Sequence, residues 1–71
     1  MSPTLAKEVE VVEREAAELL KTPYNKELVL KLAQWRRKHE LLWNREGLPK
    51  SAHLRLAAIE AKVSNHFQIS A

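Results

Sequence analysis

The sequence predicts an all-α fold, a small antiparallel three-helix bundle built from a helical hairpin and a docked third helix. Apolar residues recur at alternating spacings of four and three in three separate segments, which is the period of helices that each bury one face. Turn residues interrupt the pattern between these segments. The composition, with one glycine, three prolines and 45% hydrophobic residues, favours long regular helices over disorder or turn-rich β-structure.

The first helix is expected over about residues 3–21. Ser2 followed by Pro3 is typical of a helix start, because a hydroxyl can accept from free backbone N–H groups and proline is tolerated in the first turn. Pro23 ends the helix because it cannot extend it. The face expected to be buried consists of Leu5, Val9, Val12, Ala16 and Leu19.

The second helix, over about residues 25–45, is the longest amphipathic run in the chain. Asn25 or Thr22 is expected to cap its start. Gly47 is expected to adopt the left-handed C-cap conformation at its end, with Leu48 and Pro49 following as a stop. We expect Trp35 to anchor the core, because it is central and a buried tryptophan contributes a large apolar area. The buried face is expected to consist of Leu28, Leu32, Trp35, His39 and Leu42.

The third helix is expected over about residues 50–67, with residues 68–71 frayed. Its buried face is expected to consist of Ala52, Leu56, Ile59, Val63 and His66, with Phe67 beside the last. Short connections predict an up-down-up arrangement. An exchanged third helix, shared between two chains, is the alternative.

The charges predict a register for the first two helices. Residues 1–21 carry five glutamates against three basic residues, and residues 22–71 carry nine basic residues against four glutamates. An antiparallel hairpin that reverses about Thr22 places acidic positions beside basic ones. The expected pairs are Val12 with Leu32, Val9 with Trp35, Glu15 with Lys31 and Glu8 with Lys38.

The length of 71 residues predicts one domain, over residues 1–71, with a small core. Folding at this size buries only about 60% of the surface of the unfolded chain, so association with a partner or a second copy is expected to help. No cysteine is present, which excludes disulfides and thiol chemistry. The absence of a long apolar run or a signal-type segment predicts a cytoplasmic protein without a membrane span.

The sequence carries no recognisable catalytic or metal-binding motif. His39 and Glu40 begin an H-E-x-x-H pattern, but Trp43 occupies the position of the second histidine. Phosphate-binding glycine loops and G-x-S-x-G nucleophile motifs are also missing. We therefore expect no enzyme activity, no cofactor and no metal.

A cluster of basic residues indicates one candidate site. Phosphate groups bind such clusters, and a nucleic-acid-binding regulator is accordingly the alternative function. The competing interpretation is that these side chains pair with the acidic first helix or are solvated. The residues concerned are Arg36, Arg37, Lys38, Arg45 and Lys50.

Several apolar residues lie off the three buried faces and cannot all enter one small core. Exposed apolar residues on a small domain are typical of an interaction surface. The predicted interface consists of Leu30, Leu41, Leu54, Ala57, Ala58 and Ala61. The function expected from the sequence is a small, non-enzymatic protein–protein interaction module, such as an adaptor, inhibitor or regulatory subunit, that binds a protein partner or forms a homodimer.

Overall fold

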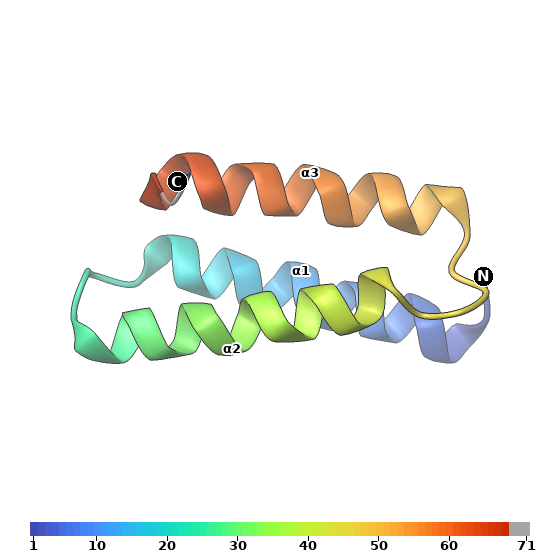
Figure 1. Ribbon diagram of the computed structural model, residues 1–71, viewed down its shortest axis with the longest axis horizontal. Helices are drawn as coiled ribbons and strands as arrows, with labels where there is room; N and C mark the ends of the chain where they lie inside the picture. Colours follow the sequence, from blue (N-terminus) through green and yellow to red (C-terminus); the bar gives the residue numbers. More distant parts are fainter. Residues whose placement is uncertain (69–71) are drawn as a thin grey trace.

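The computed structural model describes residues 1–68 and confirms an all-α protein of three helices in contact. The helices are α1 (Pro3–Lys21), α2 (Lys26–Trp43) and α3 (Lys50–Phe67). They run up, down and up, so α1 and α3 are parallel and α2 is antiparallel to both (Figure 1). Contact is most extensive along α1, which packs on both other helices, and least extensive between α2 and α3. Of the residues 68–71 expected to be frayed, Gln68 is the C-cap of α3, and residues 69–71 lie outside the described residues.

Side-chain caps fix where α1 and α2 begin. The Ser2 hydroxyl accepts a hydrogen bond from the Leu5 N–H at 3.2 Å, and the Asn25 side chain accepts from the Leu28 N–H at 2.8 Å. Each cap satisfies a backbone donor that has no partner within its helix. Both predicted caps are therefore confirmed, and α2 begins at Lys26 because Asn25 itself is extended.

The second helix ends at Trp43, two residues before the expected boundary. Asn44 stops it, since both its backbone N–H (3.1 Å) and its side-chain amide (2.9 Å) donate to the Glu40 carbonyl. Gly47 lies farther along, in a turn closed by a hydrogen bond from the Leu48 N–H to the Arg45 carbonyl at 3.3 Å. Its φ of +83° belongs to the left-handed region that glycine adopts without a steric penalty.

The predicted buried faces form the core. Ten of the fifteen predicted residues are buried, so the heptad-like spacing identifies most of the core correctly. Leu48, in the α2–α3 turn, is also buried, and helical spacing cannot predict a residue outside the helices. The buried residues are Val9, Val12, Ala16, Leu19, Leu28, Trp35, Leu42, Leu48, Ala52, Leu56 and Val63.

The prediction that His66 is buried is wrong. His66 is exposed, whereas Phe67 is partly buried and packs against the core. Both residues flank the buried face in the last turn of α3, three and four positions after Val63. Phe67 carries the larger apolar surface, so turning it inward gains more free energy than turning the imidazole inward.

Trp35 is confirmed as the centre of the core. Its side chain is 3% exposed, and its indole N–H donates to the Val12 carbonyl of α1 at 2.9 Å. This hydrogen bond satisfies the one polar atom of a large buried side chain. It also fixes which residues of α1 and α2 lie directly opposite each other, at the same level along the common helix direction.

The predicted register between α1 and α2 is wrong. Trp35 lies at the level of Val12 rather than Val9. The structure pairs Glu15 with Lys38 and Glu8 with Arg45, each at 3.0 Å. Lys31, which was expected beside Glu15, instead pairs with Glu27 one turn before it at 3.3 Å.

Two physical effects explain the shift. The connection between the helices is non-helical from Thr22 to Asn25, which centres the reversal near Pro23 and Tyr24 rather than at Thr22. Side chains on a helix also tilt toward its N-terminus. In an antiparallel pair the side chains of the two helices therefore tilt toward each other along the helix direction. The Glu15 side chain tilts toward the C-terminus of α2, so it meets a residue farther along α2 than the one directly opposite its Cα atom.

The first prediction concerns Trp35. Trp35→Ala should lower the free energy of unfolding by roughly 3–5 kcal/mol, because it removes a buried ring and leaves a cavity. Stabilities near 0.05–0.15 kcal/mol per residue are typical of small domains, so this loss removes a large part of the free energy of unfolding. Thermal and urea melts followed by circular dichroism measure the effect.

Trp43→Ala is the matched control, because Trp43 is 39% exposed and its removal should cost clearly less. If Trp35→Ala melted like the wild type, Trp35 would not be the anchor of the core.

The second prediction concerns the register. A double-mutant cycle on Glu15 and Lys38 should give a favourable coupling of under about 1 kcal/mol, as exposed ion pairs do. The same cycle on Glu15 and Lys31 should give no coupling. The reverse result would restore the register expected from the sequence.

Candidate functional site

The structure leaves all six residues of the predicted apolar interface exposed. Leu30 is 60% exposed, Leu41 58% and Leu54 62%, and the three alanines Ala57, Ala58 and Ala61 are exposed as well. Leucine side chains gain about 1.5–3 kcal/mol when they are moved from water into a packed environment. Their exposure therefore leaves a substantial free energy available for binding.

These residues form two surfaces rather than one. At 3.6 residues per turn, Leu30 and Leu41 lie on the side of α2 away from Leu28, and Leu54 lies on the side of α3 away from Leu56. We call Val11, Leu30 and Leu41 the α1–α2 face. The α3 outer face consists of Leu54, Ala57, Ala58 and Ala61.

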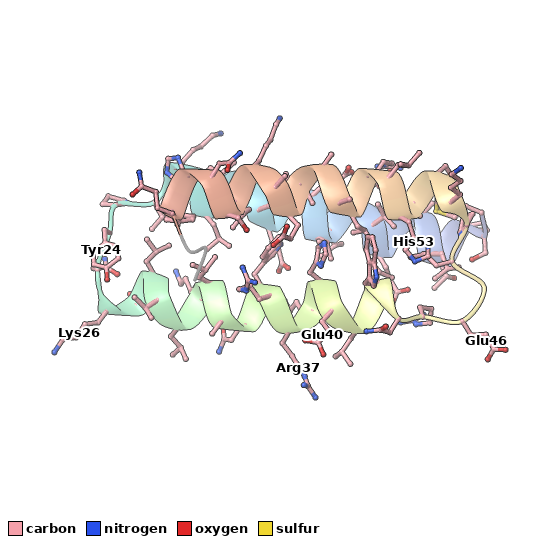
Figure 2. All side chains as sticks on the ribbon, turned by 45° about the horizontal axis from the view of Figure 1, so that its top comes forward. Tyr24, Lys26, Arg37, Glu40, Glu46 and His53 are labelled. Atoms are coloured by element: carbon pink, nitrogen blue, oxygen red, sulfur yellow. The ribbon has the colours of Figure 1, made fainter. Side chains whose placement is uncertain are left out.

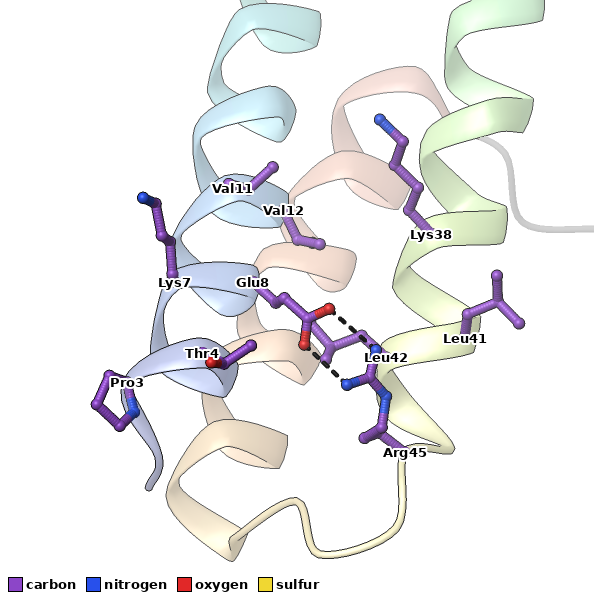
Figure 3. Close-up of a pocket in the computed structure, with 10 residues that line it drawn as sticks. All are labelled: Pro3, Thr4, Lys7, Glu8, Val11, Val12, Lys38, Leu41, Leu42 and Arg45. Carbon is purple, nitrogen blue, oxygen red and sulfur yellow. Dashed lines mark hydrogen bonds and ion pairs between the residues drawn. The ribbon is translucent and has the colours of Figure 1, made fainter.

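The α1–α2 face contains a groove of about 590 Å³. Figure 3 shows Val11 of α1 and Leu41 of α2 on its two sides, with α3 behind them. Val12 and Leu42 also line it, so its floor is apolar. The ion pair between Glu8 and Arg45 crosses from helix to helix at the end near the α2 C-terminus (Figure 3).

Sequence reasoning did not find this groove. Val11 is recognisable as an apolar residue off the buried face, but its place in the same groove as Leu41 depends on the register. The register expected from the sequence was displaced, so the two residues were not brought together. Lys7 and Lys38, which line the same groove, were likewise not assigned to it.

Aromatic rings and two histidines connect α2 to α3. The rings of His39 and Trp43 lie 6.0 Å apart, and those of Trp43 and His53 lie 4.6 Å apart. His39 Nε2–H donates to the Leu56 carbonyl at 2.8 Å, and His53 Nε2–H donates to the Trp43 carbonyl at 3.0 Å. A carbonyl only accepts, so the proton lies on Nε2 in both rings. Both histidines therefore have a structural role.

A cleft of about 380 Å³ opens beside these rings, between α2 and α3. Trp35, Trp43 and Ala57 provide its apolar lining, and Arg36 and Glu60 lie at its polar side. Within residues 1–68, no group of three or more histidine or carboxylate side chains is placed to hold a metal ion. No helix of this described part is long and apolar enough to cross a membrane.

Three of the five residues in the predicted basic cluster face carboxylates of the same chain. Arg36 lies 3.8 Å from Glu60, and Lys38 and Arg45 make the pairs with α1 described above. A further pair joins Arg55 to Glu13, whose hydrogen bond and negative charge raise the pKa of the Arg55 guanidinium. These carboxylates reduce the positive potential that a phosphate group would meet.

Arg37 and Lys50 make no ion pair with any residue in the described range 1–68. Arg37 points away from α3 into solvent (Figure 2), and Lys50 begins α3 at the other side of a turn. The five residues therefore do not form one continuous, unpaired basic surface.

Comparisons of this chain with protein-family models, with curated proteins and with solved structures found no match.

The third prediction concerns nucleic acid. Because three of the five basic residues are paired, a labelled DNA duplex should bind no better than the nonspecific range of about 10⁻⁴–10⁻⁶ M at physiological salt. Fluorescence anisotropy across a salt series measures this affinity. Sub-micromolar binding that Arg37→Ala and Lys50→Ala both weaken would make the nucleic-acid alternative the better one.

Proposed function

We propose that the protein is a non-enzymatic helical protein–protein interaction module, of the adaptor, inhibitor or regulatory-subunit type. The observation that carries the proposal is the exposure of Leu30, Leu41 and Leu54, each more than half accessible to solvent. All three lie on helix faces directed away from the core.

The core does not need these leucines. It is closed by eleven other buried residues, and among the described residues no buried side-chain polar atom lacks a hydrogen-bond partner. Leucines that the fold does not use are available to a partner. Their placement on regular helices supports docking by packing against a helix or a helical hairpin, since little conformational freedom is lost there on binding.

The α3 outer face is the surface that we assign to a partner protein. Leu54 provides the exposed apolar side chain, and Ala57, Ala58 and Ala61 around it leave room for close approach of the partner. The nucleic-acid alternative has less support, because its candidate residues do not form a continuous unpaired surface.

Capture from extract of the native cells tests this function. The tagged full chain should retain at least one protein, and Leu54→Glu should lose it, because a charge is poorly tolerated at the centre of an apolar contact. Glutamate is a good helix former, so the variant should keep its helicity.

Leu30→Glu is the matched control, with the same substitution at a similarly exposed leucine on the other face. Circular dichroism verifies that both variants are folded. If both variants retained every protein that the wild type captures, the exposed leucines would not serve protein recognition.

A further inference from the structure

We infer that the α1–α2 face docks against the same face of a second copy of this chain. The two-fold axis lies between the two faces and runs perpendicular to the helices, so α1 packs on α1 and α2 on α2, each pair in opposite directions. The inference rests on the proposed function, that exposed apolar faces bind protein, and it names the partner of one face. Three observations support it: the spacing of the apolar residues, the groove beside Leu41, and the distribution of charge along α1.

The apolar residues of this face are arranged symmetrically. The hydrogen bond from Trp35 to Val12 sets the level of α1 against α2, and it places Val11 level with Arg36. That level is midway between Leu30 and Leu41, which lie about 16 Å apart along α2 at 1.5 Å per residue.

A two-fold axis at this level exchanges the two leucines. Leu30 of one copy then meets Leu41 of the other, and the two Val11 side chains meet at the axis. This self-complementarity is what a two-fold interface requires. The groove beside Leu41, lined by Val11 and Leu42, has the volume to receive a leucine side chain.

The charges of α1 fit the same axis. Lys7 and Glu18 are exposed and lie on the same side of α1 as Val11, toward its two ends. Because the two-fold axis reverses the direction of α1, Lys7 of one copy lies near Glu18 of the other. Their offset, measured along the helix, is about 3 Å. This contact occurs twice. The same axis also brings Glu8 of one copy level with Glu15 of the other, and each of these carboxylates is already paired with Arg45 or Lys38 of its own chain.

The other possible two-fold axis, parallel to the helices, fits less well. It would place α2 of one copy over α1 of the other at the same level. Leu41 would then face the charged N-terminal part of α1 around Lys7, and Leu30 would face the neighbourhood of Glu18. Apolar side chains would be buried against charges, which is unfavourable. The axis perpendicular to the helices, which sets like helices against each other, is therefore the one that we propose, and we call it the antiparallel arrangement.

The size of the face indicates the class of association to expect. Two helices of 19 and 18 residues present a surface of about 27 by 20 Å, or on the order of 500 Å² per copy. The total of about 1,000 Å² lies at the small end of specific interfaces. We therefore expect a reversible dimer with a dissociation constant in the micromolar range, with α3 on the outside of each copy.

The fourth prediction measures this association. Sedimentation equilibrium of the full chain over low to high micromolar concentrations should give a monomer–dimer equilibrium. Leu30→Glu and Leu41→Glu should each weaken it by about tenfold or more, because each charge is buried twice in a symmetric contact. Leu54→Glu, on the α3 outer face, is the control that should dimerise like the wild type.

Disulfide cross-linking tests the direction of the axis, since the chain has no cysteine of its own. Val11→Cys should cross-link to itself, because its Cα atoms approach within the roughly 7 Å that a disulfide allows. Leu30→Cys mixed with Leu41→Cys should give the mixed disulfide in preference to either homodimer.

The outcomes separate this inference from the proposed function. A wild-type chain that stays monomeric at every concentration, or a dimer that Leu54→Glu breaks and Leu30→Glu does not, would overturn the inference. Capture of a partner that depends on Leu54 would still support the proposed function in either case. Homodimer cross-links at residues 30 and 41 in place of the mixed one would overturn the antiparallel arrangement.

Discussion

The buried Trp35 side chain joins α2 to α1, and its neighbour His39 joins α2 to α3. Its indole N–H donates to the Val12 carbonyl of α1, and its ring lies 5.3 Å from that of His39 on α2. His39 in turn donates to the Leu56 carbonyl of α3. A chain of this size has few apolar residues to bury, so one large side chain with a satisfied polar atom both fills the centre and fixes the mutual position of the helices.

That fixed position determines which side chains remain on the surface. Once Trp35 is level with Val12, Val11 and Leu41 line the same groove on the outside of the hairpin, and Lys38 and Arg45 reach the glutamates of α1. The wide rings of Trp35 and Trp43 stand between α2 and α3, which touch each other least. The binding faces that we propose are thus a consequence of how the core is packed.

Local features of the structure were predictable from the sequence, and features that depend on contacts between helices were not. The caps at Ser2 and Asn25 and the burial of Trp35 follow from residue type and spacing, which act within one helix. The register depends on the length of the non-helical connection around Pro23 and on side-chain tilt, so the pairing of Glu15 was misplaced by two turns. His66 and Phe67 both fit the spacing of the buried face, and only packing decides which of the two side chains turns toward the core. The six residues of the predicted interface were correctly expected to lie off the core, but their division into two faces required the structure.

The exchange of the two indole N–H protons with solvent tests the central role of Trp35 most directly. NMR resolves the two tryptophan side chains, and exchange reports the opening free energy at each. The Trp35 indole proton should exchange only through global unfolding, with the same free energy as the most protected backbone amides, while that of the partly exposed Trp43 should exchange far faster. Rapid exchange of both indole protons would contradict the account, because the bond to Val12 would then not hold the helices in register.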